Sequence, residues 1–394
     1  MLAIIHGNIR TMEEKDYADG YLQIEHGRIV SIGDMEECDV QALRDNHDVQ
    51  VLDAKGNTVL PGIIEAHCHM GITEEKKGME GDDCNETVNP ITPYLRAIDA
   101  INPMDDAFHD ALKAGITSAM IGPGSANVVG GQFAFLKTHG RCIDQMIVKA
   151  PAAMKVAFGE NPKVNYSGQN TSPATRMAIA SMLRQELTKA REYQRHINEN
   201  PATAPDFHYE CWLPVLEGEI PLKAHVHRAD DILTAVRIAK EFGLKMTLDH
   251  CSEGHLIIEE LHEAGFPAIV GPDMASRNKI EVGNMAFKTA GELSKNGILT
   301  AITTDHPVSK IQFLPICAGL AVKEGMSMEE GLRAITINAA KICGVDERVG
   351  SLKPGKDGDV VIYDGNPMEV FTKTLCTIVE GKIVYYDEEC GLLC

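Results

Sequence analysis

Histidines recur at the ends of apolar, strand-like runs in the middle of this sequence. The first pair, His67 and His69, closes the run that follows Pro61 and Gly62. Residues i and i+2 of a β-strand face the same side, so both imidazoles can reach one point. Imidazole is a standard ligand of zinc and related divalent ions. The spacing predicts the beginning of a metal site, although two packing histidines would give the same pattern.

Three later runs end in residues of the same kinds. His225 and His227 close one run, His250 closes the next, and Asp305 with His306 follows the last. A buried imidazole or carboxylate needs a polar partner, and one shared cation would satisfy all of them together. The recurrence favours one site assembled from several strand ends.

The elements that must position these residues are strands that alternate with helix-like segments. The apolar runs are Gly62–His67, Ile116–Ile121, Met146–Lys149, Lys155–Phe158, Leu222–His225, Lys245–Asp249, Ala268–Val270 and Leu299–Thr303. We expect helices over Asp230–Phe242 and over Ser327–Ile342, and an insertion at 161–205. Continuous apolar strands separated by helices predict a parallel sheet covered by helices, and about eight strands favour a (β/α)8 barrel. Such barrels carry their sites at the C-terminal ends of the strands.

Both ends of the chain contain short strand-like runs. Hairpin signals occur at His26-Gly27 and at Glu380-Gly381. Neither end has enough apolar residues for a core of its own, so we expect the two ends to form one small β-sandwich domain. The predicted division is 1–58 for its N-terminal part, 59–345 for the barrel and 346–394 for its C-terminal part, within an α/β fold class.

Composition narrows the possible partners. The formal charge of −20 repels phosphate backbones and anionic membrane surfaces, so we expect a small-molecule substrate and no nucleic-acid or membrane partner. The apolar stretch at the start is too short for a signal peptide or a membrane span. Eleven cysteines could suggest disulfides, but in a chain of this length with no export signal we expect reduced thiols in the cytoplasm. Their spacing gives no Cys-x-x-Cys pair. The sequence leaves open whether the chain forms a homo-oligomer.

A strand-ending His-x-His after Pro61-Gly62, two later histidines and a late Asp resemble the amidohydrolase superfamily, a group of metal-dependent hydrolases. The β domain built from both termini and the segment Gly350–Ile362 also resemble that family, and the similarity covers nearly the whole chain. It is closest to the branch of imidazolonepropionases and prolidase-like dipeptidases. The resemblance implies one or two divalent ions, usually zinc, and hydrolysis of a carbon–nitrogen bond.

The resemblance also implies individual ligands. His67 and His69 match the first metal pair, and His225 and His250 match the histidines after the fifth and sixth strands. Asp305 matches the aspartate after the eighth strand, where it would accept a proton from water and pass it to the leaving nitrogen. His250 or the ion would polarise the substrate carbonyl. His227 is the rival of His225 as a ligand and is otherwise assigned to substrate binding.

The bridging ligand and the substrate contacts are less defined. Family members with two metals use a carboxylated lysine or a glutamate; Lys155 and Glu160 are the candidates, with Glu160 preferred, and without either the site would hold one metal. Gln132 ends a glycine-rich stretch at 122–132, which could contact substrate or form only a tight connection. Arg228 and His306 lie beside proposed ligands and could bind a substrate anion, although Arg228 could equally pair with a neighbouring aspartate.

Several functions fit this ligand set. The chain could hydrolyse an amide, a cyclic amide or an amidine, or act as a prolidase-like dipeptidase. A deaminase would use the same metal residues. A catalytically inactive relative would keep the barrel, but the intact set of ligands argues against it.

Overall fold

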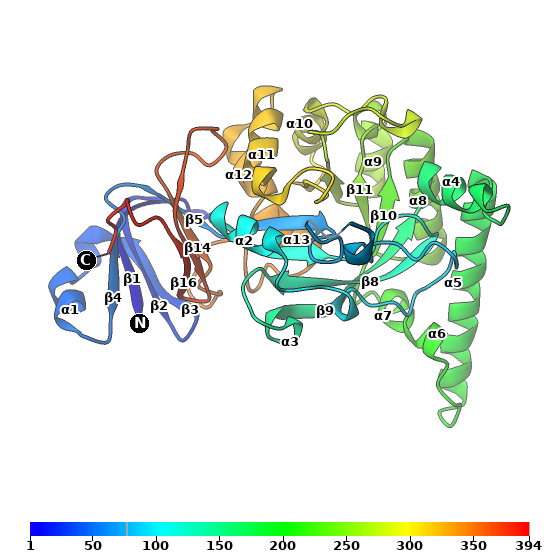
Figure 1. The fold of residues 1–394 in the computed structure, drawn as a ribbon, viewed down its shortest axis with the longest axis horizontal. Coiled ribbons are helices and arrows are strands. Elements are labelled where there is room, and N and C mark those ends of the chain that lie inside the picture. Colours follow the sequence, from blue (N-terminus) through cyan, green and yellow to red (C-terminus); the bar gives the residue numbers. More distant parts are fainter. Residues whose placement is uncertain (76–77, 394) are drawn as a thin grey trace.

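The strands of the computed structural model, which describes residues 1–75 and 78–393, form two eight-stranded sheets. One sheet comes from the middle of the chain and one from its two ends (Figure 1). Cys394, the last residue of the predicted C-terminal part, lies outside the described residues.

The central sheet is a nearly closed barrel. Its neighbouring strands follow chain order: β6 (Ile63–Cys68), β7 (Ile116–Ile121), β8 (Val129–Lys137), β9 (Ile147–Ala157), β10 (Leu222–Val226), β11 (Met246–His250), β12 (Ala268–Val270) and β13 (Thr300–Ile302). Hydrogen bonds join the ends of the last and first strands, among them the two given next. Thr303 Oγ1 donates to the carbonyl of His67 over 2.6 Å, and the amide of His69 donates to the carbonyl of His306 over 2.8 Å.

The prediction of an all-parallel ring is wrong at one strand. β8 runs antiparallel to both β7 and β9. The runs Met146–Lys149 and Lys155–Phe158, which the sequence suggested as two strands, both overlap β9. The glycine-rich stretch 122–132 is not only a loop, because β8 begins within it. Gly131 adopts φ +122°, and a Cβ atom there would lie 2.4 Å from the carbonyl of Leu95, so a glycine is required inside this strand.

Helices cover the outside of the barrel. They are α2 (Asp106–Lys113), α3 (Ile143–Met146), α8 (Ala229–Phe242), α9 (Ile258–Ala264), α10 (Lys288–Lys295), α11 (Leu314–Lys323), α12 (Met328–Ala334) and α13 (Ile337–Cys343). The predicted helix over Ser327–Ile342 begins as expected, since Ser327 Oγ accepts from the amide of Glu330. It is interrupted at Thr336, whose hydroxyl donates to the carbonyl of Leu332 over 2.6 Å and whose backbone leaves the helical region.

The insertion between β9 and β10 is helical. It contains α4 (Glu160–Gly168), α5 (Arg176–Glu199), α6 (Phe207–Glu210) and α7 (Leu213–Leu216). The side chain of Thr175 caps α5 by accepting from the amide of Ala178 over 3.0 Å. One face of α5 is buried, and its C-terminal part extends past the barrel (Figure 1).

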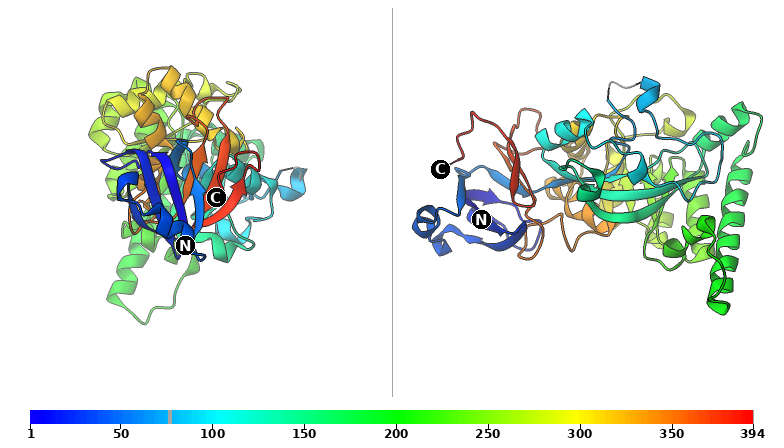
Figure 2. Two further views of the ribbon diagram at one scale, coloured as in Figure 1. Left: turned by 90° about the vertical axis from the view of Figure 1, so that its left-hand side faces the viewer. Right: turned by 60° about the horizontal axis from the view of Figure 1, so that its bottom comes forward.

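The second sheet joins the two ends of the chain (Figure 2). Its strands are β1 (Leu2–Ile9), β2 (Tyr17–Glu25), β3 (Arg28–Asp34), β4 (Gln50–Asp53), β5 (Thr58–Pro61), β14 (Val360–Tyr363), β15 (Thr374–Val379) and β16 (Lys382–Tyr386), with α1 (Val40–Asp45) beside them. β5 pairs with β1 on one side and with β14 on the other, so it crosses the predicted boundary at residue 58.

A buried cluster of charges joins this sheet to the barrel. Lys137, at the end of β8, places its Nζ 2.8 Å from Oδ2 of Asp357 and 2.6 Å from Oδ2 of Asp359, just ahead of β14. Arg28 and Arg348 also contact Asp357. Paired in this way, the two buried carboxylates and the ammonium group avoid the cost of an isolated buried charge.

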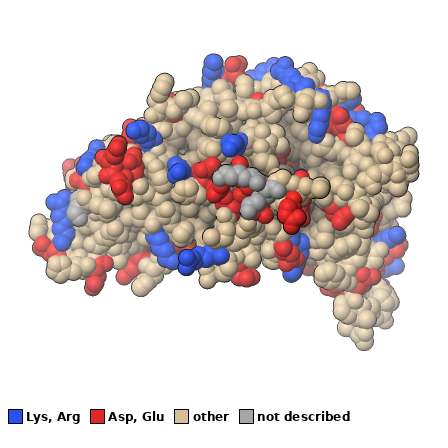
Figure 3. All heavy atoms as spheres, in the orientation of Figure 1, with Lys and Arg blue, Asp and Glu red and all other residues tan. Residues whose placement is uncertain are grey.

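No helix among residues 1–75 and 78–393 combines the length and the apolar character of a membrane span. On the face of the molecule in Figure 3, acidic side chains gather near the middle, and basic ones are scattered along the edges and beside this acidic group.

Candidate metal centre

Histidines from several strands converge with one aspartate at the C-terminal end of the barrel. They are His67, His69, His225, His227, His250 and Asp305. The five imidazoles are each at least nine-tenths buried. The structure thus brings together the histidines that the sequence placed at separate strand ends, and all six residues except His69 fall into two overlapping groups of ligand atoms.

The first group contains His67, His250 and Asp305, whose ligand atoms lie within 4.8 Å of one another. Oδ1 of Asp305 lies 3.5 Å from Nε2 of His67 and 3.3 Å from Nε2 of His69. Nζ of Lys155 lies 3.3 Å from the same atom of His67. Oδ1 of Asp305 is buried and makes no hydrogen bond within the described part of the chain, as expected for an oxygen that binds a cation.

The second group contains His225, His227 and His250, again within 4.8 Å. The ring centroid of His250 lies 4.5 Å from that of His225 and 4.7 Å from that of His227. The sequence treated His225 and His227 as rivals for one role, whereas the geometry places both beside His250.

Hydrogen bonds hold the outer nitrogen of four of these imidazoles. Nδ1 lies 2.7 Å from Asp249 Oδ2 in His67, 2.7 Å from the carbonyl of Gly122 in His69, 2.8 Å from Ser252 Oγ in His227 and 2.8 Å from the carbonyl of Gly271 in His250. An Nδ1–H that donates to oxygen leaves the lone pair on Nε2 free. Histidines that bind metals are held in this way, so the residues present fit a divalent cation.

Two backbone positions aim side chains into the site. His250 has φ +71° and Asp305 has φ +52°, both in the left-handed region that few residues other than glycine adopt. Strained positions of this kind cluster at functional sites because the surrounding structure must hold them there.

Burial and neighbouring charges shift the pKa values of the residues in the site. It lowers the pKa of His67 and of His225 well below the usual value, with further lowering by Lys155 at both and by His227 at His225. Burial also lowers the pKa of Lys155 to about 8. At Asp305 burial raises the pKa, but His250 and His69 outweigh it and the net shift is downward. Neutral imidazoles and an ionised carboxylate are the forms that bind a cation.

His69 differs from the other histidines. Burial alone would lower its pKa, but Cys84 and Asp305 outweigh that effect and raise it to about 10, so His69 is protonated in the metal-free protein and a cation that binds Nε2 displaces this proton. Cys84 is buried beside His69, and sequence reasoning assigned it no role. It lies on the connection after β6, where no spacing pattern marks it.

Two of the remaining predicted residues lie near the site. Glu160 begins α4, and its amide donates to Oε2 of Glu281 over 2.8 Å, but its carboxylate belongs to neither histidine group within the described residues. His306 is buried and adjoins Asp305; its Nδ1 accepts from the amide of Ile311, and its Nε2 has no hydrogen-bond partner in the described chain.

The side chains of the other two predicted substrate-binding residues form hydrogen bonds with neighbouring residues. Arg228 donates from Nε and from one terminal nitrogen to the two carboxylate oxygens of Asp230, over 2.9 and 3.0 Å. Gln132 lies within β8, where its side-chain amide donates to the carbonyl of Pro93 over 3.2 Å. Arg228 therefore pairs with a neighbouring aspartate, which was the alternative to substrate binding in the sequence analysis.

Sequence reasoning missed a buried polar layer beneath the histidines. Lys223, two residues before His225, places its Nζ 3.1 Å from Oδ2 of Asp249. Glu65, two residues before His67, accepts from the amide of His67 over 3.2 Å, and burial raises its pKa to about 7. The sequence did contain a signal for these residues. Side chains two positions apart on a strand lie on the same face, so Lys223 and Glu65 could have been placed on the face of the histidines.

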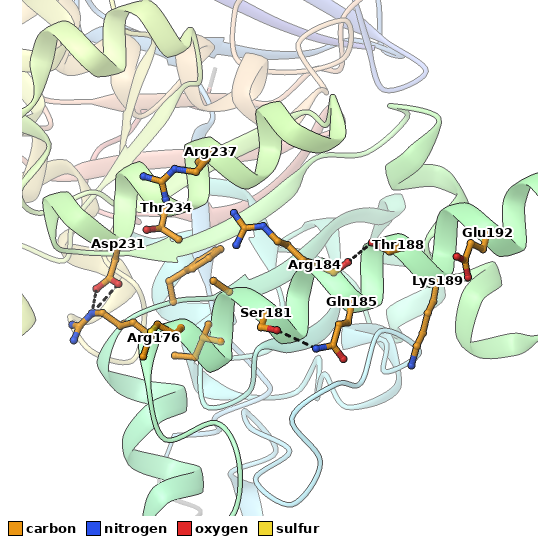
Figure 4. A pocket seen from close by; sticks show the side chains of 15 residues that line it. Arg176, Ser181, Arg184, Gln185, Thr188, Lys189, Glu192, Asp231, Thr234 and Arg237 are labelled. Carbon is orange, nitrogen blue, oxygen red and sulfur yellow. Dashed lines mark hydrogen bonds and ion pairs between the residues drawn. The ribbon is translucent and has the colours of Figure 1, made fainter.

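A wide cavity lies elsewhere, between α5 and α8. Its volume is about 780 Å³, and it shares no lining residue with the two histidine groups. Figure 4 shows Arg176 paired with Asp231 at one end of it and Arg184 and Arg237 along its wall. Gly159, the residue just before α4, is one of its lining residues.

Comparisons with known proteins agree with this geometry. Residues 221–385 match the model of an amidohydrolase family. The crystal structure of an amidohydrolase from Thermotoga maritima superposes with a TM-score of 0.93 at 35% identity, over 98% of this chain and 100% of that one. The chain belongs to the amidohydrolase family. It is therefore a hydrolase that acts on carbon–nitrogen bonds.

Two curated relatives of this amidohydrolase are more distant. It is 28% identical to amidohydrolase tasK of Hapsidospora irregularis over 86% of its own length, but it spans only 38% of that protein. It is 25% identical to an imidazolonepropionase of Alkaliphilus metalliredigens, over 88% of this chain and 84% of that enzyme.

Proposed function

We propose that this amidohydrolase cleaves the carbon–nitrogen bond of an amide, a cyclic amide or an amidine in a small molecule, with a divalent cation, most often zinc, at the barrel's C-terminal end. The observation that carries the proposal is the convergence of Asp305 Oδ1 on the Nε2 atoms of His67 and His69. A carboxylate and two imidazoles directed at one buried point are typical of a catalytic zinc site.

When bound, such an ion polarises the substrate carbonyl and makes water more acidic. Asp305 accepts the proton of the attacking water and delivers it to the leaving nitrogen, so that the carbonyl carbon gains an oxygen and the amine leaves neutral. Asp305 suits both steps because Oδ1 lacks a hydrogen-bond partner within the described chain and its pKa is held low.

The surrounding groups position these atoms. Asp249 orients His67 through Nδ1, and His250 presents a neutral imidazole between the two groups of ligand atoms. Of the two bridging candidates, Lys155 has the contact that supports the role, since its Nζ lies beside Nε2 of His67. A lysine with a pKa of about 8 is partly neutral near pH 8, and only the neutral amine can add CO2 to become a carboxylate ligand.

We also propose a cytoplasmic location. The cysteines among the described residues are all free thiols, as expected in a reducing compartment.

Elemental analysis of the purified protein, combined with a substrate panel, tests the proposed function. We expect at least one divalent ion per chain in the wild type, and loss of that ion and of all activity in His67→Ala/His69→Ala. The panel comprises an imidazolone, a dihydropyrimidine, an Xaa-Pro dipeptide and an aminopurine. Ammonia release from the aminopurine alone would indicate a deaminase instead. No ion in the wild type after reconstitution would refute the proposal.

A further inference from the structure

Glu281 is a buried carboxylate beside the second histidine group. It lies in a short 3-10 helix, Ile280–Val282, on the connection that follows β12, and it is 1% exposed. Its Oε1 lies 3.8 Å from Nε2 of His225 and 4.0 Å from Nε2 of His227. This oxygen makes no hydrogen bond to any described residue. An unsatisfied buried carboxylate oxygen is costly and calls for a missing partner.

The other oxygen of Glu281 is anchored. Oε2 accepts from the amide of Glu160 over 2.8 Å, at the first residue of α4, where the helix dipole favours a negative charge. Gly159 makes this contact possible, because a Cβ atom there would lie 2.8 Å from Oε2 and 3.0 Å from Oδ2 of Asp231. Asp231 is in turn held by Arg176 (Figure 4). With one oxygen fixed, the free oxygen faces the imidazoles.

Lys279 does not satisfy the free oxygen. Its Nζ lies 3.9 Å from Oε1 of Glu281, beyond hydrogen-bond distance, and donates instead to Oδ1 of Asn161 over 2.5 Å. The side chain of Lys279 is also 38% exposed, so water screens its charge. A group that could complete the coordination of Oε1 must lie between the carboxylate and the histidines.

We propose that Glu281 binds a second divalent cation together with His225, His227 and His250. The proposal rests on the proposed function, which supplies the first cation at His67, His69 and Asp305. Three imidazoles and one carboxylate are a suitable ligand set for zinc. Zinc bonds of about 2.0–2.1 Å place tetrahedral ligand atoms roughly 3.3 Å apart. The two separations from Oε1 of Glu281 need to shrink by less than about 1 Å, and those among the histidine atoms, which lie within 4.8 Å of one another, by at most about 1.5 Å.

This arrangement gives each cation its own ligands. His250 belongs to both groups of ligand atoms, and in this proposal it is a ligand of the second cation. The first site keeps His67, His69 and Asp305, with Lys155 beside them. His227 then acts as a metal ligand rather than as a substrate contact, and the connection after β12 becomes part of the metal centre.

Metal binding by Glu281→Gln tests the proposal. The substitution keeps the shape and an oxygen that can accept from Glu160 but removes the charge. Metal-free protein is titrated with Co²⁺ against a competing chelator, and the absorption spectrum reports the coordination of each ion. We expect two ions in the wild type and at least a tenfold loss of affinity for the second ion only in the variant. Glu263→Gln, an exposed carboxylate on α9, is the matched control and should bind both ions as the wild type does.

His227→Asn is the second variant, because it removes one proposed ligand from a different element. It should lose the same ion as Glu281→Gln. Unchanged binding of the second ion in both variants would overturn the inference. So would a wild type that binds a single ion, lost in His67→Ala/His69→Ala and retained in Glu281→Gln, while the proposed function would stand. Absence of any bound ion would overturn both.

Discussion

Nδ1 of His67 lies 2.7 Å from Oδ2 of Asp249, and both side chains are fully buried. The same oxygen lies 3.1 Å from Nζ of Lys223, and Oδ1 accepts from the hydroxyl of Thr247 over 2.7 Å. Both oxygens of Asp249 therefore have partners inside the barrel. The arrangement fixes the tautomer and the direction of His67, so Asp249 is a positioning residue of the proposed metal centre.

Asp249→Asn is expected to lower the affinity for the first divalent ion about 10- to 100-fold, because the amide no longer orients His67 as a charged acceptor. Competition titration of the metal-free protein measures this affinity. Asp144→Asn makes the same change on the exposed surface of α3 and should leave the affinity unchanged. An unaltered affinity in Asp249→Asn would show that the contact with His67 is only structural.

Lys155→Met is expected to stabilise the metal-free protein. The pKa of Lys155 is about 8 in the folded protein, against 10.5 ordinarily. Below pH 8 Lys155 is therefore protonated, although its buried surroundings favour the neutral amine. The substitution should raise the free energy of unfolding at pH 7 by up to about 3 kcal/mol and weaken metal binding. Urea denaturation measures the first effect. Lys223→Met is the contrast and should destabilise the protein, because it leaves Asp249 without its cation.

The stability of the metal-free protein should fall as the pH drops from about 6.5 to about 4. Burial lowers the pKa of His306 to about 4, so the unfolded chain takes up a proton in this range while the folded chain does not. This histidine alone accounts for about 2 kcal/mol between pH 6.5 and 5. Urea denaturation of His306→Gln at both pH values should show a smaller loss than the wild type. Equal losses would mean that His306 takes up its proton in the folded state as well.

Lys137→Met should destabilise the protein by about 3–5 kcal/mol, because Asp357 and Asp359 lose the buried ammonium group between them. Guanidinium denaturation, followed by circular dichroism, measures the change. Lys189→Met, on the exposed surface of α5, should change the stability by less than about 0.5 kcal/mol. Comparable effects of the two substitutions would argue against a structural role for the cluster.

Much of the histidine arrangement follows from local pattern. His67 and His69 stand two residues apart at the end of a strand, as do His225 and His227, and strand geometry alone directs both members of such a pair to one side. The position of His250 could not be derived in this way, because it depends on a left-handed backbone turn. Its place at a strand end was nevertheless visible in the sequence.

The direction of β8 was not predictable from composition. Its second and third residues are glycines, and a strand that pairs antiparallel to both neighbours has no distinct local signature. Glu281 was likewise invisible, because it reaches the histidines on a connection whose path depends on tertiary contacts. The preference for Glu160 over Lys155 used only the position of each residue along one strand, whereas their contacts depend on what packs against that strand.

The pairing of β5 with β14 has a consequence for biosynthesis. Thr58 lies opposite Tyr363, 305 residues later, so β5 leaves the ribosome long before its second partner, β14, has been synthesised. The N-terminal strands of this sheet therefore keep an unpaired edge at β5 until the whole barrel has been synthesised. An interrupted translation product that stops before Val360 would expose this apolar edge and be prone to aggregate.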